Sequence, residues 1–205
     1  MARWSTIERD LRAKGYRYIA GVDEVGRGPL AGPVVVCAIV MPPDQRAIPG
    51  VADSKLLSAA ERQRLAPLIR ARALAYSVAA ASVKEIERHN ILGATAVAIR
   101  RAAARLRHPY DLLLIDGKPI RQLGLDHTAV VDADARCYSV ACASILAKVV
   151  RDHLLVRLAK RYPGYGWERN AGYGTAAHLV GLRQHGQTAH HRAAYCRSAL
   201  EPPAY

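Results

Sequence analysis

Short runs of apolar residues near the start of the chain have the length and composition of strands. Residues 16–23 (YRYIAGVD) and 33–41 (PVVVCAIVM) are rich in β-branched residues and are joined by a glycine-rich turn. Residues 74–81 (LAYSVAAA) form a third run of the same kind. These segments can pair as a three-stranded antiparallel meander.

Polar residues that precede apolar periodic segments predict where helices begin. Two S-x-x-E capping boxes, at residues 58–61 and 82–85, predict a helix that runs to about residue 73 and a second, short one. Pro67 is expected to kink or split the first of these helices. Asn90 can cap a long helix that ends before Pro109.

Strand and helix patterns alternate in the middle of the chain. Residues 111–116 (DLLLID) and 127–131 (HTAVV) read as buried-type strands, and residues 139–161 read as a long amphipathic helix. Strands that follow helices in this order predict an α/β fold with a mixed sheet.

The remainder of the chain is irregular and basic. A loop is expected over residues 162–174, followed by a last helix that Thr175 caps and Gly186 ends. We therefore expect one domain at about residues 1–160, with residues 161–205 as a basic C-terminal region of helices and loops packed on it.

Charge is the first indication of a partner. The 205 residues carry a formal net charge of +13 and a sequence pI near 10.0. Ten Lys or Arg residues face only three Asp or Glu residues over positions 135–205, where tyrosines and histidines are also concentrated. Such a surface attracts polyanions, and aromatic groups among basic ones can stack on sugars or bases. A merely basic protein without such a partner is the alternative.

The other compositional features concern the cellular compartment. No apolar run reaches the length of a membrane span, and the first ten residues contain no apolar signal core. The four cysteines, at positions 37, 137, 142 and 196, form no CxxC pair. Free thiols in a reducing cytoplasm fit this spacing better than a zinc site or a disulfide framework.

Acidic residues are scarce, and four of them lie at or just after the ends of predicted strands: Asp23, Glu24, Asp116 and Asp134. Strand ends at one edge of an α/β sheet lie together, and carboxylates gathered there repel one another unless a divalent cation neutralises them. Ligands that are all oxygen suit Mg²⁺ or Mn²⁺, and with a basic surface they indicate two-metal hydrolysis of a phosphodiester. Taken singly, each Asp could instead cap a helix or a turn.

Two details of this region leave alternatives open. Adjacent side chains in a strand face opposite ways, so the strand should end or bulge at Asp23 and Glu24, which Gly26 allows. The turn at residues 26–32 (GRGPLAG) could be a nucleotide-phosphate loop, a loop that lets its backbone approach a nucleic-acid sugar, or an ordinary hairpin turn.

The chain resembles bacterial ribonuclease HII over nearly all its length. The matching stretches are IAGVDEVGRGPLAGPVV (19–35), DSKLLS (53–58), HNILGAT (89–95), LLIDG (113–117), ACASILAKVVRDH (141–153), GYGT (172–175) and HGQTAHHR (185–192). The related ribonuclease HIII usually has an extra N-terminal substrate-binding domain, and only about 18 residues precede the first motif here.

The resemblance implies a ribonuclease H-like mixed sheet, an antiparallel three-stranded meander plus parallel strands, with flanking helices and a C-terminal helical region. It implies endonucleolytic cleavage of RNA in RNA–DNA hybrids and at single ribonucleotides embedded in duplex DNA, with Mn²⁺ or Mg²⁺ and with 3′-hydroxyl and 5′-phosphate products. Such an enzyme acts in ribonucleotide removal in the cytoplasm, and nothing in the sequence requires more than a monomer.

Residue roles follow from the same resemblance. The four carboxylates named above match the metal ligands, and Gly26, Arg27 and Gly28 match the loop that contacts the ribose 2′-hydroxyl. Tyr173 matches a tyrosine that packs on the next deoxyribose. The positions expected near phosphates are Ser54, Lys55, Ser144 and Lys148.

One departure from the family and two competing functions complete the sequence-based picture. Asp132 stands where family members commonly have a lysine. It could remove a phosphate contact, help to hold metal, or be neutral. His190 and His191 are expected to pin the tail to the core. The competing functions are a non-catalytic basic nucleic-acid-binding protein and a nucleotide-cofactor enzyme built on the glycine turn.

Overall fold

The computed structural model describes residues 4–201. Its five strands are β1 (Ile19–Val25), β2 (Val34–Val40), β3 (Ala75–Ala81), β4 (Leu112–Asp116) and β5 (His127–Val130), in the spatial order β3-β2-β1-β4-β5. The pairs β1–β2 and β2–β3 are antiparallel, whereas β1–β4 and β4–β5 are parallel. This is the predicted mixed sheet with its meander.

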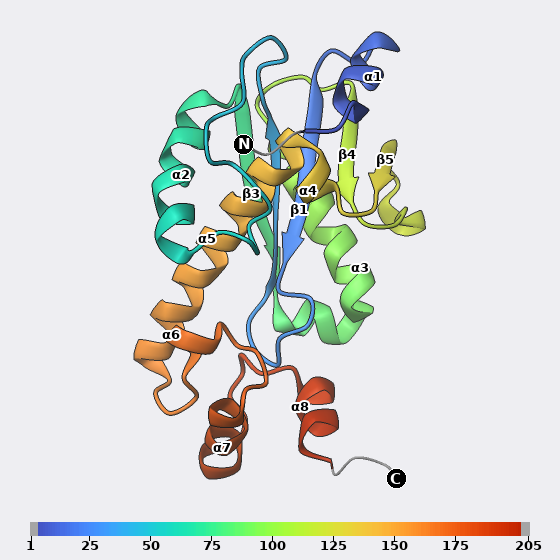
Figure 1. Cartoon of the computed structure of the whole chain (residues 1–205). Coiled ribbons are helices and arrows are strands. Elements are labelled where there is room, and N and C mark those ends of the chain that lie inside the picture. The colour runs from blue at the N-terminus through green and yellow to red at the C-terminus, as the bar shows by residue number, and fades with distance from the viewer. Residues whose placement is uncertain (1–3, 202–205) are drawn as a thin grey trace.

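Helices cover both faces of the sheet (Figure 1). Helix α3 (Val83–Ala104) packs on one face, and α5 (Tyr138–Arg161) packs on the other together with α2 (Ala59–Arg72). Every residue of β2 is buried, because this strand lies inside the sheet between the two helical layers. That position explains its unbroken apolar sequence.

The predicted helix starts are confirmed. Ser58 and Ser82 both form complete capping boxes, and the Asn90 side chain accepts hydrogen bonds from the amides of Leu92 and Gly93. Asn90 itself has φ 55°, so α3 consists of a short helix and a long one that meet at this residue. The expected split at Pro67 is wrong, since α2 continues past it.

Short helices make up the rest of the structure. They are α1 (Ile7–Ala13), α4 (Ala133–Arg136), α6 (Trp167–Asn170), α7 (Ala176–His185) and α8 (Ala193–Leu200), with a 3₁₀ turn at Arg121–Leu123. The helix capped by Thr175 is α7, and α8 follows it, so the expectation that α7 is the last helix is wrong.

The C-terminal elements gather beyond the end of the sheet (Figure 1). Tyr165, Trp167 and Leu182 form a small hydrophobic cluster there with Leu155 of α5 and Leu30 of the β1–β2 turn. This cluster joins the C-terminal region to the rest of the molecule. The division near residue 160 stays a prediction.

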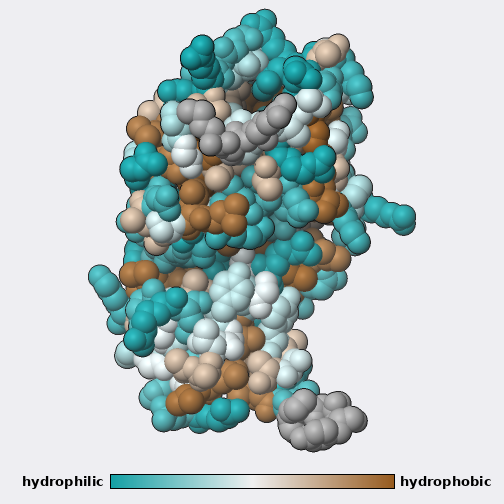
Figure 2. All heavy atoms as spheres, in the orientation of Figure 1, coloured by the Kyte–Doolittle hydropathy of each residue, from teal (hydrophilic) through white to brown (hydrophobic). Residues whose placement is uncertain are grey.

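The outer surface is mixed. Figure 2 shows hydrophobic residues in small groups among hydrophilic ones over the face it presents. No helix within residues 4–201 is long and apolar enough to cross a membrane.

Candidate active site

The parallel pairing of β1 with β4 brings two of the predicted carboxylates side by side. The last pair in this ladder is Val22 with Ile115, so Asp23 and Asp116 are the next residues on adjacent strands. Neighbouring strands lie about 4.8 Å apart. The predicted convergence of carboxylates at strand ends is therefore present for this pair.

The Glu24 side chain lies near Asp23, but the strand geometry that brings it there differs from our prediction. Residues Asp23 and Glu24 pair in unbroken register with Cys37 and Val36 of β2, and β1 continues to Val25. The strand neither ends nor bulges at the Asp-Glu pair, so that expectation is wrong. The pleat places the two side chains on opposite faces of β1, and they line one cavity because it opens at the end of the β1–β4 ladder.

The fourth carboxylate comes from helix α4. An Asp116 carboxylate oxygen accepts a hydrogen bond of 2.7 Å from the amide of Ala133, which ties the start of α4 to the end of β4. Asp134, on the next position, is 2% exposed, and its carboxylate lies 2.9 Å from the Lys55 ammonium. The short helix thus delivers Asp134 to the strand ends.

The positive charges beside these carboxylates do not offset the effect of burial on Asp23, Glu24 and Asp116. Burial raises the pKa of Asp23, and Glu24, Asp116 and Asp134 raise it further. Burial also raises the pKa of Asp116 and that of Glu24, the latter against the opposing effect of Arg27. Ionised carboxylates are therefore costly here without a cation.

The donor atoms fit a divalent cation. All four side chains offer only carboxylate oxygens, the ligands that Mg²⁺ and Mn²⁺ prefer. As placed, no three acidic, histidine or cysteine side chains of residues 4–201 are grouped closely enough to hold an ion between them. Lys55 instead provides positive charge beside Asp134.

A cavity of about 250 Å³ opens beside Asp23 and gathers the predicted site. Its wall contains every predicted site residue except Asp134: Asp23, Glu24, Gly26, Arg27, Gly28, Ser54, Lys55, Asp116, Ser144, Lys148 and Tyr173. Asp134 connects to this wall through its ion pair with Lys55. Segments from five parts of the chain thus meet at one cavity.

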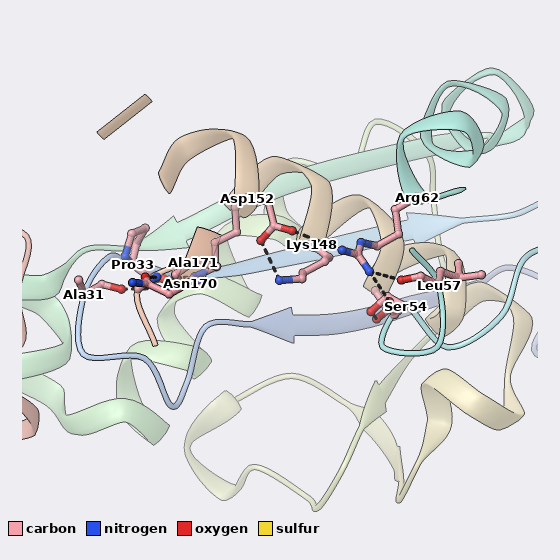
Figure 3. Close-up of polar contacts among 12 residues, drawn as sticks. Ala31, Pro33, Ser54, Leu57, Arg62, Lys148, Asp152, Asn170 and Ala171 are labelled. Carbon is pink, nitrogen blue, oxygen red and sulfur yellow. Dashed lines mark hydrogen bonds and ion pairs between the residues drawn. The ribbon is translucent and has the colours of Figure 1, made fainter. Parts of the chain in front are cut away.

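The polar residues of the cavity wall are themselves held by neighbours. The hydroxyls of Ser54 and Ser144 lie 2.6 Å apart, and Lys148 donates to Asp152 over 2.8 Å. Arg62 contacts Asp152 at 3.7 Å and also donates to the Ser54 carbonyl, so it links the Lys148 contact to the loop that carries Ser54 (Figure 3). We did not predict a role for Arg62 or Asp152.

The glycine turn is shaped by backbone conformation and by close contacts. Gly26 has φ +93°, and a Cβ there would lie 2.1 Å from the Arg151 side chain, so no larger residue fits. At Gly28 an added Cβ would meet only the Tyr173 ring, at 3.9 Å. Gly28 is therefore the position that leaves the backbone open to a ligand beside Tyr173, which is half exposed.

The nucleotide-phosphate reading of this turn is wrong. A dinucleotide loop must lead from a strand into a helix, whose N-terminus binds the phosphates. Here the turn leads from β1 into the antiparallel strand β2.

Two arginines that we did not single out hold this turn from behind. Arg151 and Arg192 are both fully buried and donate to backbone carbonyls of residues 26–33. Both residues lie inside stretches that match the family, at 141–153 and 185–192. For Arg151 the available signal was a charged residue on the buried face of a helix, and for Arg192 the sequence offered no local signal.

The remaining polar residues of interest lie away from the cavity. Asp132 is exposed, has φ 56° and is absent from the cavity wall. The backbones of His190 and His191 attach the C-terminal region to the β1–β2 turn, through the bond from the Gly32 amide to the His190 carbonyl and a bridge between Ala31 and His191. The His191 side chain is buried and bonds to Thr188 and His178 inside the C-terminal region itself.

Comparisons with known proteins give matches over nearly all of the chain. The sequence profile of ribonuclease HII matches residues 20–198. Ribonuclease HII of Thermosynechococcus vestitus is 49% identical over 193 residues, which cover 94% of this chain and 90% of that protein. Ribonuclease HII of Paracoccus denitrificans is 51% identical over 194 residues, with coverages of 94% and 90%.

Solved structures show the same arrangement of the chain. Ribonuclease H2 of Pyrococcus horikoshii superposes with a TM-score of 0.73 at 28% identity, covering 89% of this chain and 97% of that one. Ribonuclease HII of Archaeoglobus fulgidus, solved in complex with PCNA, gives a TM-score of 0.71 at 25% identity, with coverages of 85% and 93%.

Proposed function

This chain belongs to the ribonuclease HII family, and from that premise we propose that it cleaves RNA–DNA hybrids and DNA duplexes that carry single ribonucleotides. As a member of the family it is a ribonuclease H, a metal-dependent endoribonuclease. The observation that carries the finer proposal is the single cavity that combines carboxylates, an open glycine backbone and an exposed tyrosine.

The carboxylates are proposed to hold the metal. Asp23, Glu24, Asp116 and Asp134 would bind two divalent cations, Mg²⁺ or Mn²⁺. Such cations, when bound, supply Lewis acidity and a nucleophilic water for in-line hydrolysis that leaves 3′-hydroxyl and 5′-phosphate ends. Burial raises the pKa of Asp23, so a bound cation would favour its ionised form.

The turn and Tyr173 are proposed to recognise the sugar at the cleavage site. The amide N–H groups of Arg27 and Gly28 have no backbone acceptor within residues 4–201, and both residues line the cavity. They can donate to a ribose 2′-hydroxyl, the group that distinguishes RNA from DNA. Tyr173, beside Gly28, can pack on the following deoxyribose.

The basic and hydroxyl side chains are proposed to bind phosphates. Lys55 and Lys148 line the cavity beside the carboxylates, and Ser54 and Ser144 lie between them. Removal of ribonucleotides from DNA is the role that follows from this specificity.

The test is a cleavage assay on three labelled duplexes: a long RNA–DNA hybrid, a DNA duplex with one ribonucleotide, and an all-DNA duplex. We expect Mg²⁺- or Mn²⁺-dependent cleavage of the first two, mapped to one phosphodiester at the ribonucleotide, and none of the third. Binding without cleavage in either metal would favour the non-catalytic nucleic-acid-binding alternative and would overturn the proposal.

A further inference from the structure

Arg151 and Arg192 are two guanidinium groups inside the protein with no anion beside them. They are 0% and 1% exposed, and neither forms an ion pair within residues 4–201. A buried charge without a partner is strongly unfavourable unless its hydrogen bonds are satisfied. Burial and the neighbouring Arg151 accordingly lower the pKa of Arg192 to about 10.

Backbone carbonyls take the place of the missing anions. Arg192 donates to the carbonyls of Gly26, Arg27 (2.7 Å) and Gly32 (2.8 Å). Arg151 donates to the carbonyls of Ala31 (3.0 Å), Pro33 (3.1 Å) and Ala171 (2.8 Å), three acceptors labelled in Figure 3. Between them the arginines bind five carbonyls of residues 26–33, and the planar fork of each guanidinium fixes their directions.

The orientation of these carbonyls determines where the amides point. In a planar trans peptide the carbonyl of one residue and the N–H of the next point in opposite directions. The carbonyls of Gly26 and Arg27 point inward to Arg192, so the N–H groups of Arg27 and Gly28 point away from it. Those two residues line the cavity beside Asp23.

We propose that Arg192, supported by Arg151, is a positioning residue that sets the discrimination between ribose and deoxyribose. It acts through the turn, by holding two peptide groups in the orientation that aims their amides at a 2′-hydroxyl. This inference rests on the proposed function of the turn. It also assigns a purpose to the C-terminal region, because Arg192 directly precedes α8.

The test uses Arg192→Lys, which keeps the charge but lacks the fork that reaches several carbonyls. Its matched control is Arg197→Lys, an exposed arginine on α8. The measurement is affinity, in Ca²⁺ to prevent cleavage, for a duplex with one ribonucleotide and for the same duplex in all-DNA form. We expect Arg192→Lys to lower the ratio of these affinities about tenfold, which corresponds to about 1.4 kcal/mol, and to leave all-DNA affinity unchanged.

Several outcomes of these measurements would contradict the proposed role of Arg192. A folded Arg192→Lys with the wild-type ratio would overturn the proposal, as would equal losses for both duplexes, which indicate a general structural defect. As a second variant, Arg192→Ala should regain the wild-type ratio when methylguanidinium is added and not when methylammonium is added. Failure of methylguanidinium to restore a ratio lost in that variant also counts against the proposal.

Hydrogen exchange separates this inference from the proposed function. The amides of Leu30, Ala31 and Gly32 are hydrogen-bonded to Gly172 and His190, so their exchange reports the order of the turn. We expect faster exchange there in Arg192→Lys and unchanged exchange in Arg197→Lys. Unchanged exchange in both variants would show that Arg192 does not hold the turn in place and would overturn the proposal. A wild-type affinity ratio near one, with faster exchange in Arg192→Lys, would instead overturn the 2′-hydroxyl function of the turn.

Discussion

Asp23 shows how a single residue can be unfavourable for folding and still be required. It is buried at the end of the β1–β4 ladder with three other carboxylates nearby, and both effects raise its pKa. Keeping it ionised near neutral pH therefore costs stability in the protein without metal. Its proposed chemistry as a metal ligand needs that same ionised form.

We expect Asp23→Asn and Asp116→Asn to lose nearly all cleavage while the metal-free protein unfolds at the same or a higher temperature. The amide removes a buried negative charge and also one metal ligand. Activity at ordinary Mg²⁺ concentration and thermal unfolding without metal are the two measurements. Asp126→Asn, an exposed carboxylate, should change neither. Near-normal turnover by Asp23→Asn would refute the site assignment.

Tyr173 should matter most when the substrate has a deoxyribose after the ribonucleotide. We expect Tyr173→Ala to lose more cleavage on a single embedded ribonucleotide than on a long hybrid, by about 1–3 kcal/mol in kcat/KM, the range for one stacking contact. The exposed Tyr76 provides the control, as Tyr76→Ala. Equal losses on both substrates would mean that the ring is only structural.

Residue chemistry was the most predictable level. The carboxylates were recognisable because each lies near the end of an apolar strand segment, and parallel register then brings Asp23 beside Asp116. The contact of Arg62 was not predictable, because Arg62 lies on α2 and reaches Asp152 of α5 only in the folded chain. The Lys148–Asp152 pair is local, since the two residues are four positions apart on α5, and that spacing was an available signal.

At the level of elements, β1 and α5 pack closely against each other at Gly21. A Cβ added to Gly21 would lie 2.4–2.6 Å from atoms of Ser139, so the helix can lie this near the strand only where glycine stands. This contact holds the N-terminal part of α5 against the strand that carries Asp23 and Glu24.

Gly21→Ala should therefore destabilise the fold by about 1–3 kcal/mol, the usual cost of overpacking a tight contact. Chemical denaturation measures the free energy of unfolding. Gly124→Ala is the comparison variant, because nothing lies within 4 Å of its added Cβ and no steric overlap is expected. The φ of +64° at Gly124 adds backbone strain of its own, which is part of the measured change in that variant. The prediction fails if Gly21→Ala leaves the free energy of unfolding unchanged.

Helices could be predicted where a capping residue precedes a segment long enough to show a helical period. The interruption at Asn90 was visible because an Asx cap precedes a long apolar face. Helices α4 and α6 have four residues each, too few for a helical period, and α1 is held from outside: the Glu8 carboxylate accepts from the Tyr138 amide at the start of α5. Such contacts between distant segments leave no local pattern.

At the level of the whole molecule, the C-terminal region is held together by two buried histidines, His178 and His191, that must both be neutral. Trp167 donates to His178 Nε2, which leaves His178 Nδ1 as the donor to the Tyr173 carbonyl. The Thr188 amide donates to His191 Nδ1, which leaves His191 Nε2–H directed at His178 Nε2, where it shares that acceptor with the Trp167 N–H. A proton added to either ring would face a donor.

Stability should accordingly fall in mild acid. Burial, with smaller effects of His178 and His190, lowers the pKa of His191 to about 4 from the ordinary value of 6.5. The unfolded chain then binds more protons than the folded one between about pH 6.5 and pH 4, so the histidine contribution to stability is present above this window and is lost on descending through it. Thermal unfolding across these pH values measures the loss.

Two substitutions distinguish the contribution of the buried histidines from a general loss of stability in acid. His191→Gln should have a flatter pH dependence over the same window, whereas His153→Gln, at an exposed position, should match the wild type. Parallel pH profiles for His191→Gln and the wild type would contradict the assignment to the buried pair.

The bond between Arg192 and the Gly26 carbonyl spans 166 positions of the sequence. A ribosome therefore releases β1, with Asp23 and Glu24, long before it adds the residue that orients the turn next to them. A nascent chain can pair its strands and gather all four carboxylates while the amides of that turn still lack a fixed direction. On the proposed role of Arg192, selectivity for the sugar would be acquired late in synthesis, after the parts proposed to perform the hydrolysis are already made.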